Sequence, residues 1–432
     1  MKMTYKNRVA DILLVNQLNS AGAVLIQGPK WCGKTTTAEQ NAKSVIYIDH
    51  PGKFKDNLFL AENNPELLLQ GDVPRLIDEW QLTPQLWDAA RFIVSRRGEV
   101  GQFIFTGSAV PADKNKINHT GTGRFAWITM RPMSLWESGE SNGTVSLSDL
   151  FEGKEVSSSA PDVSLENLAY LICRGGWPAT IDMKMDAALR QSMNYVDAVC
   201  NNDISRVDNV GRDSAFAHRL LKSYARHQGG QVPISTIYSD LTQFKSSSMT
   251  EETISSYMSA LRKIFVIEDM PAWNPNIRSK TAIRTSDTRY FVDSSIATAS
   301  LGIGVNDLLN DLNTMGLLFE TMSVRDLRVY ADALDGQVFH YRDANGLECD
   351  AVIHLRNGSY GLIEIKMGGE SLIEEGAAVL NKLESKIDTT KMKSPSFSRS
   401  SSSITMTISP LASAAAVSSI VENFMILHRM LK

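Results

Sequence analysis

The sequence lacks the features that mark several classes of protein. Its four cysteines, at positions 32, 173, 200 and 349, form no Cys-x-x-Cys pair and have no histidine cluster beside them. This excludes a disulfide framework or a zinc ribbon and favours a reducing compartment. No uninterrupted apolar run approaches the roughly 18 residues of a membrane span, and the N-terminal stretch does not resemble a secretory signal. We therefore expect a cytoplasmic protein with no membrane contact.

The sequence also lacks a strong excess of charge of either sign. Its 44 Lys and Arg residues face 48 Asp and Glu residues, so the net charge is −4. No global positive field attracts nucleic acid, and any DNA contact must come from a local patch. Hydrophobic residues make up 43% of the 432 positions, which is enough to bury real cores. At about 150 residues per domain, this length predicts two to three domains.

Short apolar runs alternate with helical segments over the first 140 residues. One helical segment with an apolar face is Leu86–Arg96. The apolar runs have the length of buried strands and lie at Ala23–Gln27, Val45–Asp49, Leu76–Asp78, Gln102–Thr106 and Phe125–Met130. This alternation predicts an α/β fold in which helices wrap a parallel sheet.

The strongest motif follows the first apolar run. Residues 28–35 are a complete G-x-x-x-x-G-K-T sequence between a strand and a helix-competent segment. Its glycines permit a tight turn, and its backbone N–H groups can wrap phosphates at a helix N-terminus. We expect Lys34 to reach the β- and γ-phosphates of ATP and Thr35 to bind Mg²⁺. The full set expected to contact the nucleotide is Gly28, Pro29, Lys30, Trp31, Cys32, Gly33, Lys34, Thr35 and Thr36.

The second part of the expected site is an apolar run that ends in two carboxylates. We expect Asp78 to bind Mg²⁺ and Glu79 to activate the attacking water as a general base. The alternative is an acidic pair that is simply exposed after a strand.

Two later segments would complete this site. The next strand ends in small polar residues, so Thr106 or Ser108 would lie beside the γ-phosphate. Arg124, in the run Gly-Thr-Gly-Arg, would act as an arginine finger or sensor, and a finger acting in trans would require self-association. The structural alternatives are an ordinary strand-end turn at Thr106 and Ser108, and a solvent-facing side chain at Arg124.

Together these motifs carry a family resemblance. GPKWCGKTT, LIDEW, FTGS, GRF and RPMSLWE occur in this order, and residues 1–140 resemble prokaryotic AAA-type P-loop ATPases that carry a C-terminal domain of unknown function. The resemblance implies an ATPase core that uses ATP and Mg²⁺. Arg174–Pro178 and the Asp203-Ile204 pair also resemble this family, although Asn202 stands where the family usually has arginine. Gly175 and Gly176 most simply make a turn above a packed Trp177.

The middle of the chain reads as three helices and a hairpin. We expect helices at Phe216–Arg226, Ile234–Leu241 and Thr250–Ile264. Wing strands at Phe265–Met270 and Arg289–Val292 would flank a loop with three cations, Arg278, Lys280 and Arg284. Residues 206–291 hold 12 basic and 8 acidic residues, a local net charge of +4. This predicts a winged-helix-like region that contacts double-stranded DNA; the alternative is a lid or interaction module.

A second group of charged residues lies near the C-terminus. Strands are expected at Gln337–Tyr341, Cys349–Leu355 and Gly361–Lys366, which would place Glu364 and Lys366 on one face, near Asp350. These three residues match the signature of the PD-(D/E)xK nuclease superfamily, which the chain resembles here. The resemblance implies that Asp350 and Glu364 bind a divalent metal for phosphodiester hydrolysis, with Glu320 adding a carboxylate. The alternative is a Glu364–Lys366 ion pair on the protein surface.

The expected organisation has four parts. They are an ATPase domain at 1–140, a helical linker and winged-helix-like domain at 141–300, a nuclease-like α/β domain at 301–390 and a Ser-rich tail at 391–432. The tail reads as flexible, and a shifted reading frame is a second hypothesis for its composition. Residues 137–159 read as a linker or long loop.

Two functions remain open from the sequence. The first is Mg²⁺-dependent ATP hydrolysis coupled to DNA binding or processing. The second is a nucleotide-gated regulatory or scaffold protein whose nuclease-like domain is catalytically silent. A P-loop kinase is disfavoured, because Asp78-Glu79 fits the activation of water better than that of a bound hydroxyl.

Overall fold

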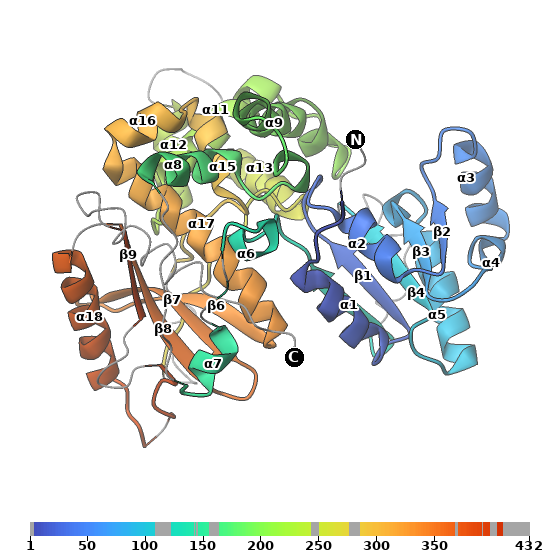
Figure 1. The fold of residues 1–432 in the computed structure, drawn as a ribbon. Coiled ribbons are helices and arrows are strands. Elements are labelled where there is room, and N and C mark those ends of the chain that lie inside the picture. Colours follow the sequence, from blue (N-terminus) through green and yellow to red (C-terminus); the bar gives the residue numbers. More distant parts are fainter. Residues whose placement is uncertain are drawn as a thin grey trace. The chain divides into compact units, whose positions relative to one another are not determined.

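The computed structural model describes residues 4–108, 122–141, 143, 146–154, 164–242, 250–275, 286–367, 370–390, 392–397 and 404–408. The chain divides into two compact units (Figure 1). The first unit comprises Met1–Pro132, Ala198–Ser214 and Ser256–Val266. The second unit comprises Met133–Asp197, Ala215–Ser255 and Ile267–Lys432.

A parallel five-stranded sheet forms the centre of the first unit. Its strands run in the order β2-β3-β4-β1-β5, and every neighbouring pair is parallel. Their bounds are β1 Ala23–Gln27, β2 Ser44–Tyr47, β3 Arg75–Asp78, β4 Phe103–Gly107 and β5 Phe125–Thr129. The α/β fold with a parallel sheet expected from the alternating apolar runs is therefore confirmed.

Alternation along the central strand β1 builds a hydrophobic layer on each face of this sheet. Val24 and Ile26 pack with residues of α1 (Val9–Leu18) and α2 (Lys34–Asn41). Ala23 and Leu25 lie in the opposite layer. That layer includes residues of α3 Phe54–Asn63, α4 Pro65–Leu68, η1 Trp80–Leu82 and α5 Gln85–Arg97. Burial on both faces explains why β1 and β4 begin with continuous apolar runs, Ala23–Ile26 and Phe103–Phe105, rather than alternating.

Two later parts of the chain belong to the same unit. Residues 198–214 contain a π-helical turn, η4 (Val199–Asp203), and the short α10 (Ile204–Arg206). The last part of α13 (Glu251–Lys263) also belongs here from residue 256 onward. The first unit is thus assembled from three separate stretches of sequence.

The second unit begins with a helical region. Its helices are α6 Leu135–Ser138, α7 Leu147–Phe151, α8 Leu165–Arg174, η3 Pro178–Thr180, α9 Met185–Ala198, α11 Ser214–Arg226, α12 Ile234–Thr242, α15 Ser294–Leu301 and α16 Val305–Asn310. The expectation of a continuous loop over 137–159 is wrong at α7. Ser146, which reads as a loop residue, caps that helix by accepting a hydrogen bond from the N–H of Asp149.

The turn at Gly175 and Gly176 is confirmed. Gly175 has φ +71°, and a Cβ on Gly176 would lie 2.1 Å from the carbonyl oxygen of Met133. Trp177 is 2% exposed, and its Nε1 donates to Ser295 Oγ at 2.9 Å. Glycine is required here because two backbone segments approach closely.

The expected wing is present only as isolated bridges among the described residues. Ile267 pairs with Phe291 and Met270 with Thr288, both antiparallel, and no regular strand forms at these positions. Arg278, Lys280 and Arg284 lie outside the described residues. The winged-helix interpretation therefore stays a prediction.

A small sheet ends the second unit. Strands β6 (Gly336–Arg342), β7 (Glu348–Leu355) and β8 (Tyr360–Met367) are antiparallel, and β9 (Ile404–Ile408) pairs with β8 in parallel. Helices α17 (Leu312–Ala333) and α18 (Glu370–Ser385) pack against this sheet (Figure 1). All three expected strands are present, whereas most of the Ser-rich tail lies outside the described residues. None of the described helices is long and apolar enough to span a membrane.

Candidate functional site

The loop between β1 and α2 is tightly turned. Gly28 has φ +153°, and a Cβ there would lie 2.0 Å from the carbonyl oxygen of Met130. Gly33 caps α2 in the left-handed region at φ +98°. Trp31 between them is also left-handed, at φ +67°, and is 46% exposed. The loop thus curls around the N-terminus of α2, an arrangement suited to bind phosphates.

The ammonium of Lys34 lies inside this loop. Its Nζ donates to the carbonyl oxygens of Gly28 at 3.0 Å and Pro29 at 2.7 Å. The residue is 7% exposed. A buried cation bonded to neutral carbonyls attracts an anionic ligand strongly, because little water screens its charge.

Three predicted residues meet beside the loop. The register of the parallel strands aligns Thr106 with both Ile26 and Asp78, so the carboxyl ends of β1, β3 and β4 lie together. Thr35 Oγ1 donates to Asp78 Oδ1 at 2.8 Å, and Thr106 Oγ1 donates to the same oxygen. Ligands of open α/β sheets bind at this end of the strands.

The carboxyl of Glu79 lies next in sequence, in a strained turn. Its φ is +57°, and Gln81 Nε2 donates to its Oε2. Burial raises the pKa of Glu79, and the neighbouring Asp78 charge raises it further. Burial also raises the pKa of Asp78, while the hydrogen bonds from the two threonines oppose that rise. A carboxylate with a raised pKa is a better proton acceptor near neutral pH.

Arg124 is not brought to this site within its own chain. Its carbonyl oxygen accepts hydrogen bonds from the N–H groups of Gly22 and Ala23, at the amino end of β1. The phosphate loop follows the opposite, carboxyl end of that strand. The side chain is exposed, so a role in the site of a second copy stays a prediction. Ser108 is buried directly after β4.

Two residues distant from the motif hold the loop. The buried guanidinium of Arg8 donates to the carbonyl oxygens of Cys32 at 2.8 Å and Arg131 at 2.9 Å. Asp203 accepts a hydrogen bond from Lys30 at 2.6 Å. Sequence reasoning missed Arg8, which no local pattern marks, and it identified the Asp203-Ile204 pair only through the family resemblance, without its contact to Lys30.

The donor set at this site suits Mg²⁺. The Thr35 hydroxyl and the Asp78 carboxylate are hard oxygen ligands of the kind Mg²⁺ prefers. Within the described part of the chain, no group of three or more His, Cys, Asp or Glu residues is placed to bind one metal ion. The residues fit a magnesium ion that takes most of its ligands from phosphates and water.

The second unit brings together the nuclease-like residues. Asp350 on β7 lies opposite Glu364 on β8, as the antiparallel register requires. Lys366 Nζ lies 2.6 Å from Glu364 Oε1 and 3.3 Å from Asp350 Oδ2. Glu364 is 3% exposed, whereas the Lys366 side chain is 29% exposed, so the pair joins a buried carboxylate to a half-buried cation.

A third carboxyl comes from α17. Glu320 accepts a hydrogen bond from the Tyr290 hydroxyl. Burial raises the pKa of Glu320 to about 8, and the Asp350 charge adds to the rise. Burial, again the largest cause, also raises the pKa values of Asp350 and Glu364. Burial thus disfavours the ionised form of all three carboxyls, and the positive charge of Lys366 partly stabilises that form.

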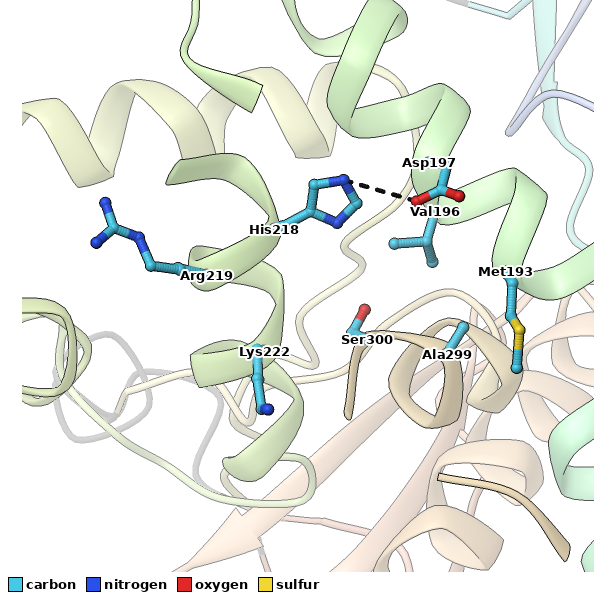
Figure 2. Close-up of a pocket in the computed structure, with 8 residues that line it drawn as sticks. All are labelled: Met193, Val196, Asp197, His218, Arg219, Lys222, Ala299 and Ser300. Carbon is cyan, nitrogen blue, oxygen red and sulfur yellow. Dashed lines mark ion pairs between the residues drawn. The ribbon is translucent and has the colours of Figure 1, made fainter. Parts of the chain in front are cut away.

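A shallow cavity of about 370 Å³ lies among α9, α11 and α15 (Figure 2). His218 Nε2 is 3.7 Å from Asp197 Oδ1 across it, and the Arg219 side chain points away from that pair (Figure 2). The lining residues are Met193, Val196, Asp197, His218, Arg219, Lys222, Ala299 and Ser300.

Three segments of the chain match known domain families. Residues 20–138 match an AAA domain, residues 165–307 a domain of unknown function (DUF8612) and residues 315–402 a domain of unknown function (DUF4143). The chain therefore carries an AAA domain followed by segments that match these two domains. The expected resemblance to the AAA family with a C-terminal domain of unknown function is confirmed. None of these three family descriptions names a nuclease.

Two mycobacterial proteins are similar to the chain over most of its length. Uncharacterized protein Rv2008c of Mycobacterium tuberculosis and uncharacterized protein Mb2031c of Mycobacterium bovis are each 24% identical to the chain over 376 residues. These alignments cover 84% of the chain and 74% of each relative.

Two archaeal structures are also similar. The Walker-type ATPase PABY2304 of Pyrococcus abyssi has 14% identity and a TM-score of 0.39, covering 68% of this chain and 96% of that one. The ORC2 protein of Aeropyrum pernix has 11% identity and a TM-score of 0.28, covering 72% and 97%.

Proposed function

We propose that the first unit binds ATP with Mg²⁺ and hydrolyses it, and that this turnover is coupled to DNA binding or DNA processing. The observation that carries the proposal is the convergence of the Thr35 and Thr106 hydroxyls on Asp78, beside the loop that encloses Lys34. These groups come from α2, β4, β3 and the loop. A chance motif match would not bring them to one point.

Each group has a distinct proposed role. Lys34 would exchange its carbonyl hydrogen bonds for phosphate oxygens, and the loop amides would bind the remaining phosphate charge. Thr35 and Asp78 would hold Mg²⁺, which neutralises phosphate charge when bound. Thr106 would orient Asp78. Glu79 would take the proton of the attacking water, a role that its raised pKa favours.

Phosphate release from ATP tests this part of the proposal. The wild type is compared with and without Mg²⁺, and with Lys34→Ala. Lys43→Ala is the matched control, because Lys43 is exposed at the end of the same helix. We expect Mg²⁺-dependent release that Lys34→Ala abolishes and Lys43→Ala preserves. Equal release from the wild type and Lys34→Ala would overturn the assignment of the loop.

The proposed DNA contact is supported by one face of α11. His218, Lys222 and Arg226 follow each other at intervals of four residues, so they share a face of this helix. Lys222 and Arg226 are exposed, and Arg226 has Asp240 as a partner at 3.5 Å. Cations spaced along an exposed helix face can contact successive phosphates of a nucleic acid.

Fluorescence anisotropy with a labelled DNA duplex tests this contact. Lys222→Ala should weaken binding by a similar factor for unrelated sequences and lower the salt dependence by about one phosphate contact. Lys184→Ala, which removes an exposed lysine just before α9, should leave binding unchanged. DNA-stimulated phosphate release that disappears in Lys222→Ala would support coupling. Unchanged DNA affinity in that variant would contradict this surface.

DNA processing and the silent alternative are both compatible with the cluster at Asp350. Its carboxyls could bind a divalent metal that activates water for phosphodiester hydrolysis. The alternative, a nucleotide-gated regulatory or scaffold protein, is favoured by Lys366, which already pairs with Asp350 and Glu364 without any metal. Plasmid nicking with Mg²⁺ or Mn²⁺ separates the two. Nicking lost in Asp350→Ala supports processing, and no nicking by the wild type supports the alternative.

A further inference from the structure

The phosphate loop has a charged partner outside the AAA-matched residues. Lys30 Nζ lies 2.6 Å from Asp203 Oδ1, a residue 173 positions further along the chain. The Asp203 side chain is 12% exposed and that of Lys30 is 46% exposed. The pair thus joins a solvent-reaching cation of the loop to a largely buried carboxylate of the same unit.

The segment around Asp203 is held by a buried arginine. Arg212, whose side chain is 2% exposed, donates to the carbonyl oxygen of Ile204 at 2.7 Å and to Asp208 at 2.6 Å. Its own N–H donates to Ser205 Oγ at 3.0 Å. These bonds close residues 204–212 into a compact turn. This turn follows Asp203 directly and restricts the backbone position of that residue. The contact between Asp203 and Lys30 therefore has one partner that is held in place.

Asp203 also ends an irregular stretch of helix. It is the last residue of the π-helical turn η4 (Val199–Asp203), which follows α9 directly. Turns of π-helix are rare and frequently lie at functional sites. A change in the partner of Asp203 therefore acts at the junction of η4 and α10.

We propose that Asp203 and the terminal phosphates of a nucleoside triphosphate compete for Lys30. Lys30 belongs to the loop that would bind a polyanion, so its ammonium has two alternative anionic partners. The Asp203 carboxylate neutralises this cation and also repels the phosphates. Nucleotide binding would then release Asp203 and loosen the η4–α10 segment. This inference rests on the proposed nucleotide site.

The competition predicts a specific pattern of affinities for a fluorescent, slowly hydrolysed ATP analogue with Mg²⁺. Asp203→Asn should bind it roughly two- to fivefold more tightly than the full-length wild type, the size expected for one partly exposed ion pair. Lys30→Met should bind more weakly by a similar factor. The double variant should match Lys30→Met, because Asp203 acts through Lys30. Asp186→Asn, an exposed acid on α9, is the charge control and should have no effect.

Hydrogen exchange supplies a second measurement. If the Lys30–Asp203 pair had only a structural role, nucleotide binding would leave the exchange rates of the nearby amides unchanged. The amides of residues 199–206 should exchange faster when the wild type binds the analogue. In Asp203→Asn they should exchange fast with or without it.

The outcomes separate this inference from the proposed function. Binding by the wild type that is lost in Lys34→Ala supports the nucleotide site whatever Asp203 does. Unchanged or weaker binding by Asp203→Asn then overturns the competition alone, as does an Asp203→Asn effect that persists in the Lys30→Met background. No binding by the wild type contradicts both proposals.

Discussion

A buried lysine in one unit, Lys34, and a half-buried lysine in the other, Lys366, have very different partners. Lys34 donates to the carbonyl oxygens of its own loop. Lys366 lies between two carboxylates, 2.6 Å from Glu364 and 3.3 Å from Asp350. The first ammonium can accept an anionic ligand without losing an ion pair, whereas the second is already neutralised. One site is thus prepared for a ligand, and the other is stable without one.

This difference determines which interactions a ligand must displace at each site. A nucleotide that enters the loop replaces the hydrogen bonds of Lys34 to neutral carbonyl oxygens with hydrogen bonds to charged phosphate oxygens, which are stronger. A metal ion that binds Asp350 and Glu364 must compete with Lys366 for the same oxygens. The two lysines should therefore respond in opposite ways to substitution, one through ligand affinity and the other through stability.

The largest expected effect is on nucleotide binding. Lys34→Ala should lower the affinity for a fluorescent ATP analogue roughly 100-fold, because it removes two charged hydrogen bonds of about 1.5 kcal/mol each. Lys366→Ala should leave this affinity within about twofold of the wild type, since it lies in the other unit. Equilibrium titration measures both. Equal losses of nucleotide affinity in the two variants would contradict a specific role for Lys34.

A smaller effect is expected on stability. Lys366→Met leaves two desolvated carboxylates without their cation, and should lower the free energy of unfolding by about 1–3 kcal/mol at pH 8. Lys386→Met removes the partner of Asp343, a more exposed pair, and should cost less than about 1 kcal/mol. Urea unfolding compares them. A cost for Lys386→Met that equals or exceeds the cost for Lys366→Met would show that Lys366 does not offset buried charge.

A further effect concerns the pH dependence of stability. Burial raises the pKa of Glu320 from 4.5 to about 8, so the folded chain keeps a proton that the unfolded chain releases. Stability from this group is present below pH 4.5 and is lost as pH rises toward 8. Glu320→Gln cannot ionise, so its unfolding free energy should fall less than that of the wild type between pH 5 and pH 8.

Binding of Mn²⁺ tests whether the carboxylates beside Lys366 form a metal site. If Asp350 and Glu364 bind a divalent ion, Mn²⁺ at pH 8 should raise the melting temperature of the wild type by a few degrees and leave Asp350→Ala unchanged. Equal shifts in both proteins would place the metal elsewhere and would favour a silent cluster.

Local sequence predicted the parts of the structure that depend on neighbouring residues. The loop at residues 28–35 and the acids at the end of β3 are visible because strand, turn and helix signals lie next to each other. Asp350, Glu364 and Lys366 share one hairpin, so their meeting follows from the period of a strand. In each case the residues that interact are close in sequence or belong to adjacent strands.

The remainder depends on contacts between distant residues. The partners of Arg8 lie 24 and 123 residues away, and the partner of Lys30 lies 173 residues away, so no spacing rule connects them. Arg124 is the reverse case. Its motif matches the expected pattern, yet the parallel register places it before β5, away from the loop of its own chain, and only the role in a second copy stays a prediction. Ser146 reads as loop although it caps a helix.

The most direct test of the central claim is phosphate release by Glu79→Gln. This variant keeps the loop, Lys34 and Asp78, and lacks only a group that can accept the proton of water. The account predicts that it binds ATP with Mg²⁺ as tightly as the wild type and releases phosphate at least about 100-fold more slowly. Wild-type release rates in Glu79→Gln would contradict the account.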